Sequence, residues 1–289
     1  MNSSHSGRRL RHAVATAVLL AIVAASGASA SAADLGVSQE TAPARQSDWS
    51  VIVSPYLWAA SLQGEGALRG IPVNVDVPFS ETFKNLDIGL MGVVEVTNGA
   101  FGVFVNGEYV DVTSEKTFRP KLPVIGQTEV NVGAGTTTTI VSAGAYYRAF
   151  EAPLGGDNAF GGARVLGISP LAGLRWTRLE GNLSVEVPDV ASREVSDSVQ
   201  WVDPFVGARV DIDLTPRWNL AIEGDVGGFD IGSRISLNGQ AYLGYRTQIL
   251  GHETMWRIGY RALYQDYTKG GFDWDVTQHG PVIGASVRF

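Results

Sequence analysis

The sequence predicts an all-β protein built as one antiparallel β-barrel, and three observations support this prediction. From Trp49 to Phe289, apolar and polar residues alternate with a period of two, as they do along a strand with two different faces. No stretch in this range combines a convincing helical period with helix caps. The 35 glycines, 7 tryptophans and 9 tyrosines fit a turn-rich sheet with aromatic anchors.

The alternation divides into ten candidate strands. They are 49–62, 86–97, 100–113, 135–150, 164–179, 199–214, 217–228, 236–250, 253–267 and 275–289. Tight connections with turn chemistry lie at Thr97–Ala100, Leu214–Arg217 and Leu250–Glu253. Long connections lie at 63–85, 114–134 and 180–198, all at the opposite end of a ten-stranded barrel, with 151–163 as a longer turn at the tight end.

One of the long connections leaves the number of strands open. Residues Ile71 to Phe79 carry their own alternation, with Val73, Val75 and Val77 on one face. This piece is either an extension of a strand above the membrane, which we favour, or part of a further hairpin. The sequence therefore predicts ten strands, with twelve as the alternative.

The first residues have the pattern of an exported protein. Arg8, Arg9 and Arg11 precede an apolar run from Ala13 to Ala25 and then small residues, which is the pattern of a secretory signal peptide. We expect 1–32 to be removed, with cleavage between Ala30 and Ala33. Residues 33–48 are polar and predict a disordered periplasmic lead-in to a barrel over 49–289.

Alternation alone fits a soluble barrel as well as a membrane barrel. The leader, the long loops at one end and the aromatic residues near the strand ends favour a transmembrane barrel in the outer membrane of a Gram-negative cell, with short periplasmic turns and long extracellular loops. The aromatic residues expected at the lipid interfaces are Tyr147, Trp176, Trp218, Tyr245, Trp256, Tyr264 and Phe289. The final strand, which ends on Phe289, is the expected contact for the barrel insertion machinery.

The inward faces of the strands carry many charges. Four strands have glycine and arginine two residues apart, as in Gly207-Ala208-Arg209, and the glycine leaves room for a long neighbouring side chain. We expect a paired network in the lumen, because an uncompensated charge in a dry interior is costly. Its predicted members are Arg148, Arg175, Arg209, Arg246, Arg257, Arg261, Arg288, Glu95, Glu108, Asp203, Asp211, Glu223 and Asp225. Arg209, Glu223 and Arg246 are expected at similar heights, as a ladder of ion pairs.

Several chemistries are disfavoured by composition. The chain has no cysteine, which excludes disulfides and thiol nucleophiles. Without the three leader arginines, 22 basic residues fall to 19 against 29 acidic ones, a net charge of −10 that argues against nucleic acid as a partner. His252 lies in a turn and His279 on the outward face, so no catalytic, metal or cofactor site is predicted. Lys116, Arg119 and Lys121 are candidates for contact with lipopolysaccharide.

A set of short motifs in a fixed order carries a family resemblance. They are Ser54-Pro55-Tyr56-Leu57-Trp58, Asn85-Leu86-Asp87, Trp201 to Arg209, Gly224 to Ser233, Gly259-Tyr260-Arg261 with Asp266-Tyr267, and Gly280-Pro281. Together they cover about 49–289, and the chain resembles an uncharacterised family of proteobacterial outer-membrane β-barrel proteins with porin-like members. The resemblance implies the barrel and its location, and brings no substrate or catalytic residue.

The sequence therefore predicts an outer-membrane barrel that is not an enzyme. It is either a structural envelope protein with a charge-filled lumen or a narrow passive pore for small solutes. A barrel enzyme acting on envelope lipid or peptide, with rim acids such as Asp225 or Asp230, is one alternative. A soluble periplasmic barrel that binds an apolar ligand is the other. Outer-membrane lipid is the expected surrounding, and the sequence does not define an oligomeric state.

Overall fold

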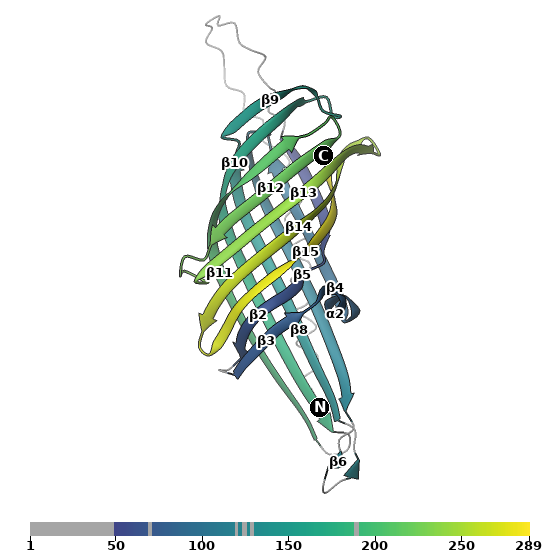
Figure 1. The fold of residues 1–289 in the computed structure, drawn as a ribbon, viewed down its shortest axis with the longest axis vertical. Coiled ribbons are helices and arrows are strands. Elements are labelled where there is room, and N and C mark those ends of the chain that lie inside the picture. Colours follow the sequence, from purple (N-terminus) through teal and green to yellow (C-terminus); the bar gives the residue numbers. More distant parts are fainter. Residues whose placement is uncertain (1–48, 69–70, 119–120, 123–125, 128–129, 188–190) are drawn as a thin grey trace, which may run out of the picture. The chain divides into compact units, whose positions relative to one another are not determined.

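Ten strands form a closed antiparallel barrel (Figure 1). The computed structural model describes residues 49–68, 71–118, 121–122, 126–127, 130–187 and 191–289, so the predicted signal peptide and lead-in lie outside it. In order around the wall the strands are β1 (Ser50–Trp58), β4 (Leu86–Thr97), β5 (Phe101–Phe118), β8 (Val130–Tyr147), β10 (Ala163–Val187), β11 (Ala191–Asp213), β12 (Trp218–Gly227), β13 (Ile235–Ile249), β14 (His252–Lys269) and β15 (Phe272–Arg288). The predicted all-β fold with ten strands is confirmed.

The barrel closes between its first and last strands. β1 pairs with β15 from Ile52 opposite Arg288 to Trp58 opposite Val282, which joins the first predicted strand, 49–62, to the last, 275–289. β2 (Ser61–Leu68) continues along the same edge of β15, and β3 (Ile71–Val77) folds back on β2. The extension of the first strand is thus β2, whereas the alternating piece at 71–79 is the return arm of a hairpin with β2 and not the predicted strand extension. The barrel has ten strands, so the twelve-stranded alternative is wrong.

Short elements fill the remaining connections. The helix α2 (Phe79–Lys84) joins β3 to β4, and β6 (Lys121–Leu122) pairs with β7 (Gly126–Gln127). Among the described residues, helices are too short and too polar to cross a bilayer. β9 (Phe150–Asp157) pairs with the start of β10, so 151–163 is largely a strand instead of the predicted turn. Its pairing satisfies backbone groups that an open turn would leave to solvent.

The two ends of the barrel differ in their connections. The turn end carries the tight turns, where Asn98 Oδ1 accepts hydrogen bonds from the amides of Ala100 and Phe101, and Thr215 Oγ1 accepts one from Trp218. At the opposite, tall end, β10 and β11 remain paired as far as Val187 opposite Ala191. Much of 114–134 and 180–198, predicted as loops, is therefore strand, because hairpin pairing continues to satisfy the backbone beyond the last well-patterned residues.

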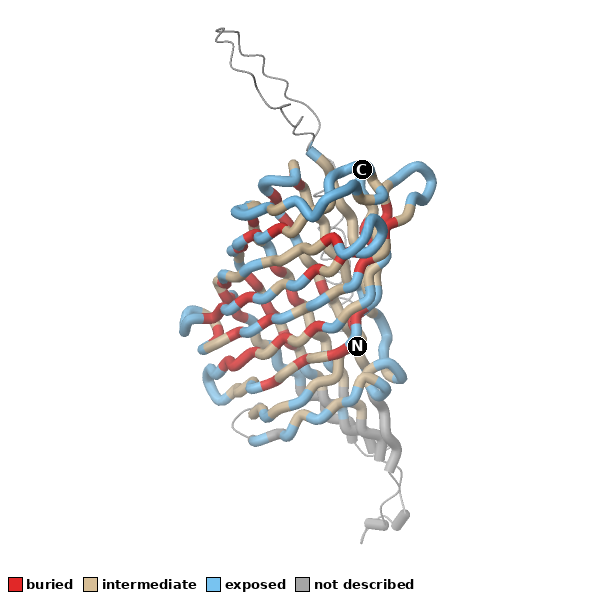
Figure 2. The backbone as a smooth tube through the Cα atoms, turned by 45° about the horizontal axis from the view of Figure 1, so that its top comes forward, coloured by how far each residue is buried: buried red, intermediate tan, exposed pale blue. Residues whose placement is uncertain are grey.

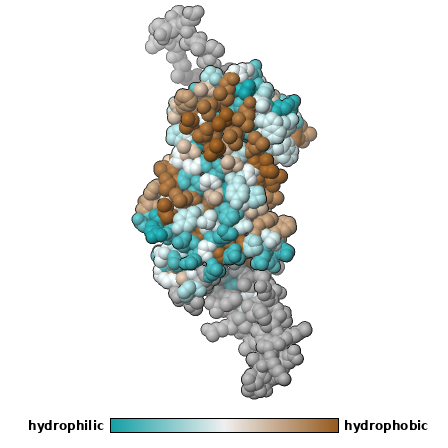
Figure 3. All heavy atoms as spheres, in the orientation of Figure 1, coloured by the Kyte–Doolittle hydropathy of each residue, from teal (hydrophilic) through white to brown (hydrophobic). Residues whose placement is uncertain are grey.

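Buried and exposed positions alternate along the strands (Figure 2). On β15, Gly280, Val282 and Ser286 are buried, whereas Ile283 between them is 59% exposed. The exposed face is apolar, with Val206, Ile222, Leu243 and Ile258 among its side chains. On the face visible in Figure 3, apolar residues gather toward the turn end and hydrophilic residues increase toward the tall end. The barrel thus presents an apolar outer wall around a polar interior.

Candidate functional site

The barrel interior is the candidate site, and it contains two networks of charged side chains. In the network nearer the turn end, Arg209 Nε donates to Glu223 at 2.8 Å and its Nη1 donates to Glu95 at 3.2 Å. The Tyr146 hydroxyl donates to the second oxygen of Glu95 at 2.6 Å, and Gln240 Nε2 donates to Glu223 at 2.7 Å. This turn-end network links β4 and β8 to β11, β12 and β13.

The second network lies nearer the tall end and crosses the lumen. Arg261 of β14 pairs with Glu108 of β5 at 2.6 Å, and its Nε donates to Asn238 at 3.0 Å. The Asn106 amide donates to Glu108 at 2.8 Å. Arg261 and Glu108 are both buried, so this crossing pair is shielded from solvent and its two charges depend on each other.

The same crossing network continues to the far side of the lumen. Asn238 Nδ2 donates to Asp225 at 2.8 Å, and Arg175 Nη2 donates to both carboxylate oxygens of Asp225, at 2.8 and 2.9 Å. Arg175 and Asp225 side chains are each 2% exposed. Arg175 Nη1 donates to Ser236 Oγ at 2.8 Å, so the guanidinium is held by two different residues.

Aromatic rings support the three central arginines. The guanidinium of Arg261 lies 4.4 Å from the ring centroid of Trp58, and those of Arg209 and Arg175 lie 4.8 Å from Tyr146 and 5.0 Å from Phe205. Cations are attracted to such ring faces. The rings find room because glycines lie beneath them: a Cβ placed on Gly102 or Gly173 would overlap Tyr146 or Phe205.

An apolar cluster lies inside the barrel at the level of the crossing network. Trp58, Ile140, Leu263 and Val282 form one packed cluster, in which Leu263 is 0% and Ile140 1% exposed. Ile140 belongs to β8 and Leu263 to β14, and four strands separate these two in either direction around the ring. Side chains from opposite walls therefore pack together inside the barrel.

A second apolar cluster lies toward the tall end. Trp201 and Tyr267 stack with ring centroids 4.3 Å apart and pack with Leu179. Asp203 accepts hydrogen bonds from Trp201 Nε1 at 3.1 Å and from the Ser233 amide at 2.6 Å. At the rim, Arg234 pairs with Asp266, and this hydrogen bond together with the carboxylate charge raises the pKa of the Arg234 guanidinium.

The structure corrects two predicted partnerships. Arg246 lies outside the ladder with Arg209 and Glu223: Glu223 stands opposite Gln240, and Arg246 pairs with Asp213 close to the turn end. The predicted heights of these residues came from counting along each strand from its turn. The count is wrong here because neighbouring strands of a closed barrel are staggered along the barrel axis. Asp203 bonds neutral donors instead of an arginine.

The remaining predicted charges lie near the turn end. Arg148 is 3.6 Å from Asp211, and Arg288 is 3.7 Å from Glu253. Arg257 lines the same interior, and within the described part of the chain it makes no hydrogen bond and no ion pair. Lys116, Arg119 and Lys121 lie outside the residues whose side chains are described.

The predicted interface aromatics lie on the outward side of their strands. Tyr147, Trp218, Trp256 and Phe289 are exposed and near the turn end, while Tyr245 is partly buried against Trp218 at 4.8 Å between ring centroids. Trp176 and Tyr264 are partly buried and lie nearer the tall end. One group of aromatic residues thus lies nearer each end of the barrel, and their contact with two lipid interfaces stays a prediction.

Sequence reasoning missed the neutral members of the networks. Tyr56, Asn106, Tyr146, Asn238 and Gln240 all bond to the charged groups or to one another inside the barrel. Each of these residues lies on the inward face that the alternation predicts, so their position inside the barrel could have been predicted from the sequence. Their partners depend on the stagger between strands, which the alternation does not contain.

The histidines and acids form no further site in the described residues. His252 stacks on Phe289 at the turn end, and His279 shares a hydrogen bond of 2.7 Å with the Tyr260 hydroxyl on the outer face. No group of three or more potential metal ligands occurs there either.

Comparisons with known proteins find similarity only at the level of the fold. No model of a known protein family matches the chain, and no curated protein matches it. Among solved structures it is similar to the outer membrane protease OmpT of Escherichia coli, with 10% identity and a TM-score of 0.40 over 84% of this chain and 97% of that one. It is also similar to the attachment invasion locus protein Ail of Yersinia pestis (12% identity, TM-score 0.30, 83% of this chain and 98% of that one). A third similar structure is a major outer membrane protein of Thermus thermophilus (12% identity, TM-score 0.31, 83% and 99%).

Proposed function

We propose that the protein is a structural outer-membrane β-barrel whose lumen is sealed, so that it does not act as a pore. The observation that carries this proposal is the packing of Ile140 and Leu263, which come from opposite sides of the ring and are almost fully buried in one cluster. A barrel of about ten strands is near the size at which side chains fill the interior. The crossing pair of Arg261 and Glu108 reinforces the same layer.

Location in the outer membrane rests on the sequence and the outer wall together. A secretory leader brings the chain to the periplasm, and the exposed wall is apolar around a charged interior, the reverse of a soluble barrel. The turn end, where both β1 begins and β15 ends, then faces the periplasm. The surrounding partners are outer-membrane lipid and, at the tall end, lipopolysaccharide, with Phe289 presented to the insertion machinery.

The alternatives have less support. A passive pore needs a continuous water path, and two buried layers interrupt the lumen. An enzyme needs a nucleophile or acid–base set, whereas both carboxylate oxygens of Asp225 accept hydrogen bonds from Arg175. A soluble barrel would bury its apolar face inside, and here that face is outside.

Two measurements test the proposal. After fractionation of cells that express the full chain, we expect the protein in the outer-membrane fraction, with a gel mobility that changes on heating. Proteoliposomes that contain the refolded barrel should swell no faster in small sugars than empty liposomes. Recovery in the soluble fraction without detergent contradicts the location, and rapid swelling contradicts the seal.

A further inference from the structure

A cavity of about 240 Å³ lies inside the barrel in the half nearer the turn end. Gly99, in the turn between β4 and β5, and Arg288, close to the C-terminus, both line it, so it reaches the rim. Tyr56 and Arg261 line its other end, where the sealing layer begins. The cavity is therefore a cup that opens at the turn end and is closed above.

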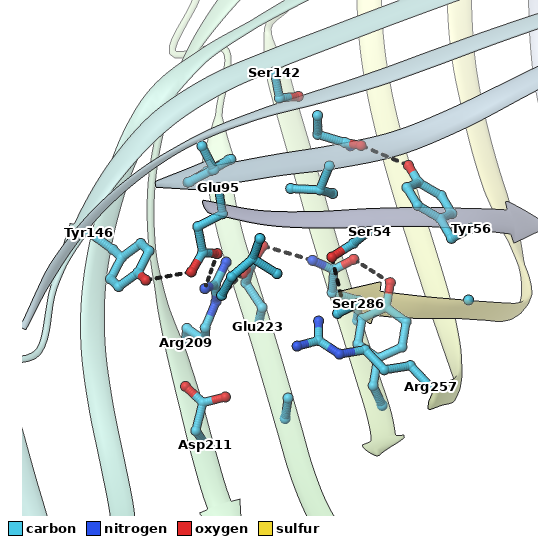
Figure 4. A pocket seen from close by; sticks show the side chains of 18 of the residues that line it. Ser54, Tyr56, Glu95, Ser142, Tyr146, Arg209, Asp211, Glu223, Arg257 and Ser286 are labelled. Atoms are coloured by element: carbon cyan, nitrogen blue, oxygen red, sulfur yellow. Dashed lines mark hydrogen bonds and ion pairs between the residues drawn. The ribbon is translucent and has the colours of Figure 1, made fainter. Parts of the chain in front are cut away.

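Arg257 of β14 projects into this cup without a partner (Figure 4). Its Nε is buried and forms no hydrogen bond, and no carboxylate of the described residues lies within 4.0 Å of its guanidinium. Glu95 and Asp211 attract it only from a longer distance, and Arg209 repels it. The hydrogen bonds that Glu95 accepts come from Arg209 and Tyr146.

The other arginines of the cup differ from Arg257 in having carboxylate partners. The pairs are Arg148 with Asp211 at 3.6 Å, Arg175 with Asp225 at 2.8 Å, Arg209 with Glu223 at 2.8 Å, Arg261 with Glu108 at 2.6 Å and Arg288 with Glu253 at 3.7 Å. Arg257 is half-buried, and in the described chain its guanidinium has no carboxylate within ion-pair distance, so it can pair with an anion that enters the cup from solution.

Neutral donors lie beside the open guanidinium. Arg257 stands opposite Gly284 on β15, and Ser286 follows two residues later on the same inward face. Ser54 and Ser286 share one hydrogen bond of 2.7 Å, which leaves one hydroxyl proton of the pair free to donate. Both serines line the cup, so a guanidinium fork and a hydroxyl border the same space.

We propose that this cup binds a small oxyanion, a carboxylate or phosphate group, through Arg257 with help from Ser286. The planar guanidinium offers two parallel donors that match the oxygens of either group. The cavity volume corresponds to roughly eight water molecules at about 30 Å³ each, enough for such an anion and part of its hydration. Binding itself does not depend on membrane location; only entry from the periplasm rests on the proposed function.

The test is a titration of the refolded barrel in detergent micelles with inorganic phosphate and, separately, with acetate, followed by calorimetry. We expect saturable binding to the wild type and a loss of at least about tenfold in affinity for Arg257→Gln, since a charge-assisted pair is removed. Arg257→Lys keeps the positive charge but loses the two parallel donors of the guanidinium, so its affinity should lie between those of the wild type and Arg257→Gln. Arg217→Gln, in the exposed turn between β11 and β12, is the matched control and should bind like the wild type.

Anion-dependent thermal stability gives a second readout. Saturating phosphate should raise the melting temperature of the wild type and of Arg217→Gln, but not that of Arg257→Gln. Equal affinities in wild type and Arg257→Gln, or no saturable binding of either anion to the wild type, overturn the proposal. If the barrel binds phosphate but also conducts ions, the anion-binding inference holds and the proposed sealed function is wrong. If the barrel neither conducts nor binds either anion, the proposed function holds and the inference is wrong.

Discussion

Replacing Glu108 by alanine isolates the charge pair that crosses the lumen. The change removes the carboxylate 2.6 Å from Arg261. Among the described residues, the buried guanidinium then keeps only Asn238 and, at 3.5 Å, the Tyr56 hydroxyl as hydrogen-bond partners. Removing one member of a buried pair costs about 3–5 kcal/mol. At about 4 kcal/mol the folding equilibrium constant falls by roughly 10³. Glu108 also accepts from Asn106, so the true cost belongs in the upper part of this range.

The matched control is Glu180→Ala, which removes the same group from an exposed pair. Arg178 and Glu180 are 37% and 40% exposed, and such surface pairs contribute about 0–1 kcal/mol. Urea unfolding in phospholipid vesicles, followed by tryptophan fluorescence, compares the two variants with the wild type. Equal losses of unfolding free energy in Glu108→Ala and Glu180→Ala would refute the view that the crossing pair is buried and interdependent.

Three further predictions concern the core, the outer wall and the last residue. Leu263→Ala, at a fully buried position packed with Ile140, should cost about 2–5 kcal/mol in the same unfolding assay; a loss below 1 kcal/mol contradicts the sealing layer. Ile222→Arg on the exposed wall should cost about 2–4 kcal/mol in vesicles, since the charge enters lipid, and an unchanged stability there contradicts the membrane orientation. Phe289→Ser should slow barrel assembly in cells but change the unfolding free energy of the refolded barrel by no more than about 0.5 kcal/mol, because Phe289 is exposed at the strand end. The assembly rate is measured in pulse-labelled cells by the heat-modifiable gel mobility, and an unchanged rate contradicts this prediction.

Many strands of the barrel wall could be predicted because strand alternation and turn residues depend on neighbouring positions in the sequence. β4 runs from Leu86 to Thr97 as predicted, since Asn98 and Gly99 set the turn that ends it. The inward face followed from the same alternation that exposes Ile283 and buries Val282. The height of the tall hairpins was not predictable in this way, because their ladders continue where the sequence pattern weakens.

The partners inside the lumen could not be predicted from the sequence. Strand parity placed Arg209, Arg246 and Arg257 inside, but the stagger of the closed sheet decides which acids they meet. Arg209 meets two acids, Arg246 meets Asp213, and Arg257 meets none within ion-pair distance in the described chain. The unpaired arginine, which carries the oxyanion proposal, is a result of that stagger and became visible only in three dimensions.

Single-channel recording in planar lipid bilayers tests the sealed lumen most directly. The refolded wild-type barrel, with insertion verified independently by its heat-modifiable mobility in the same vesicles, should give no steady conductance. A barrel with Trp58→Ala and Leu263→Ala, which removes two members of the sealing cluster, should conduct and so shows that the method detects an opened lumen. Steady conductance of the wild type equal to that of this double variant would contradict the account.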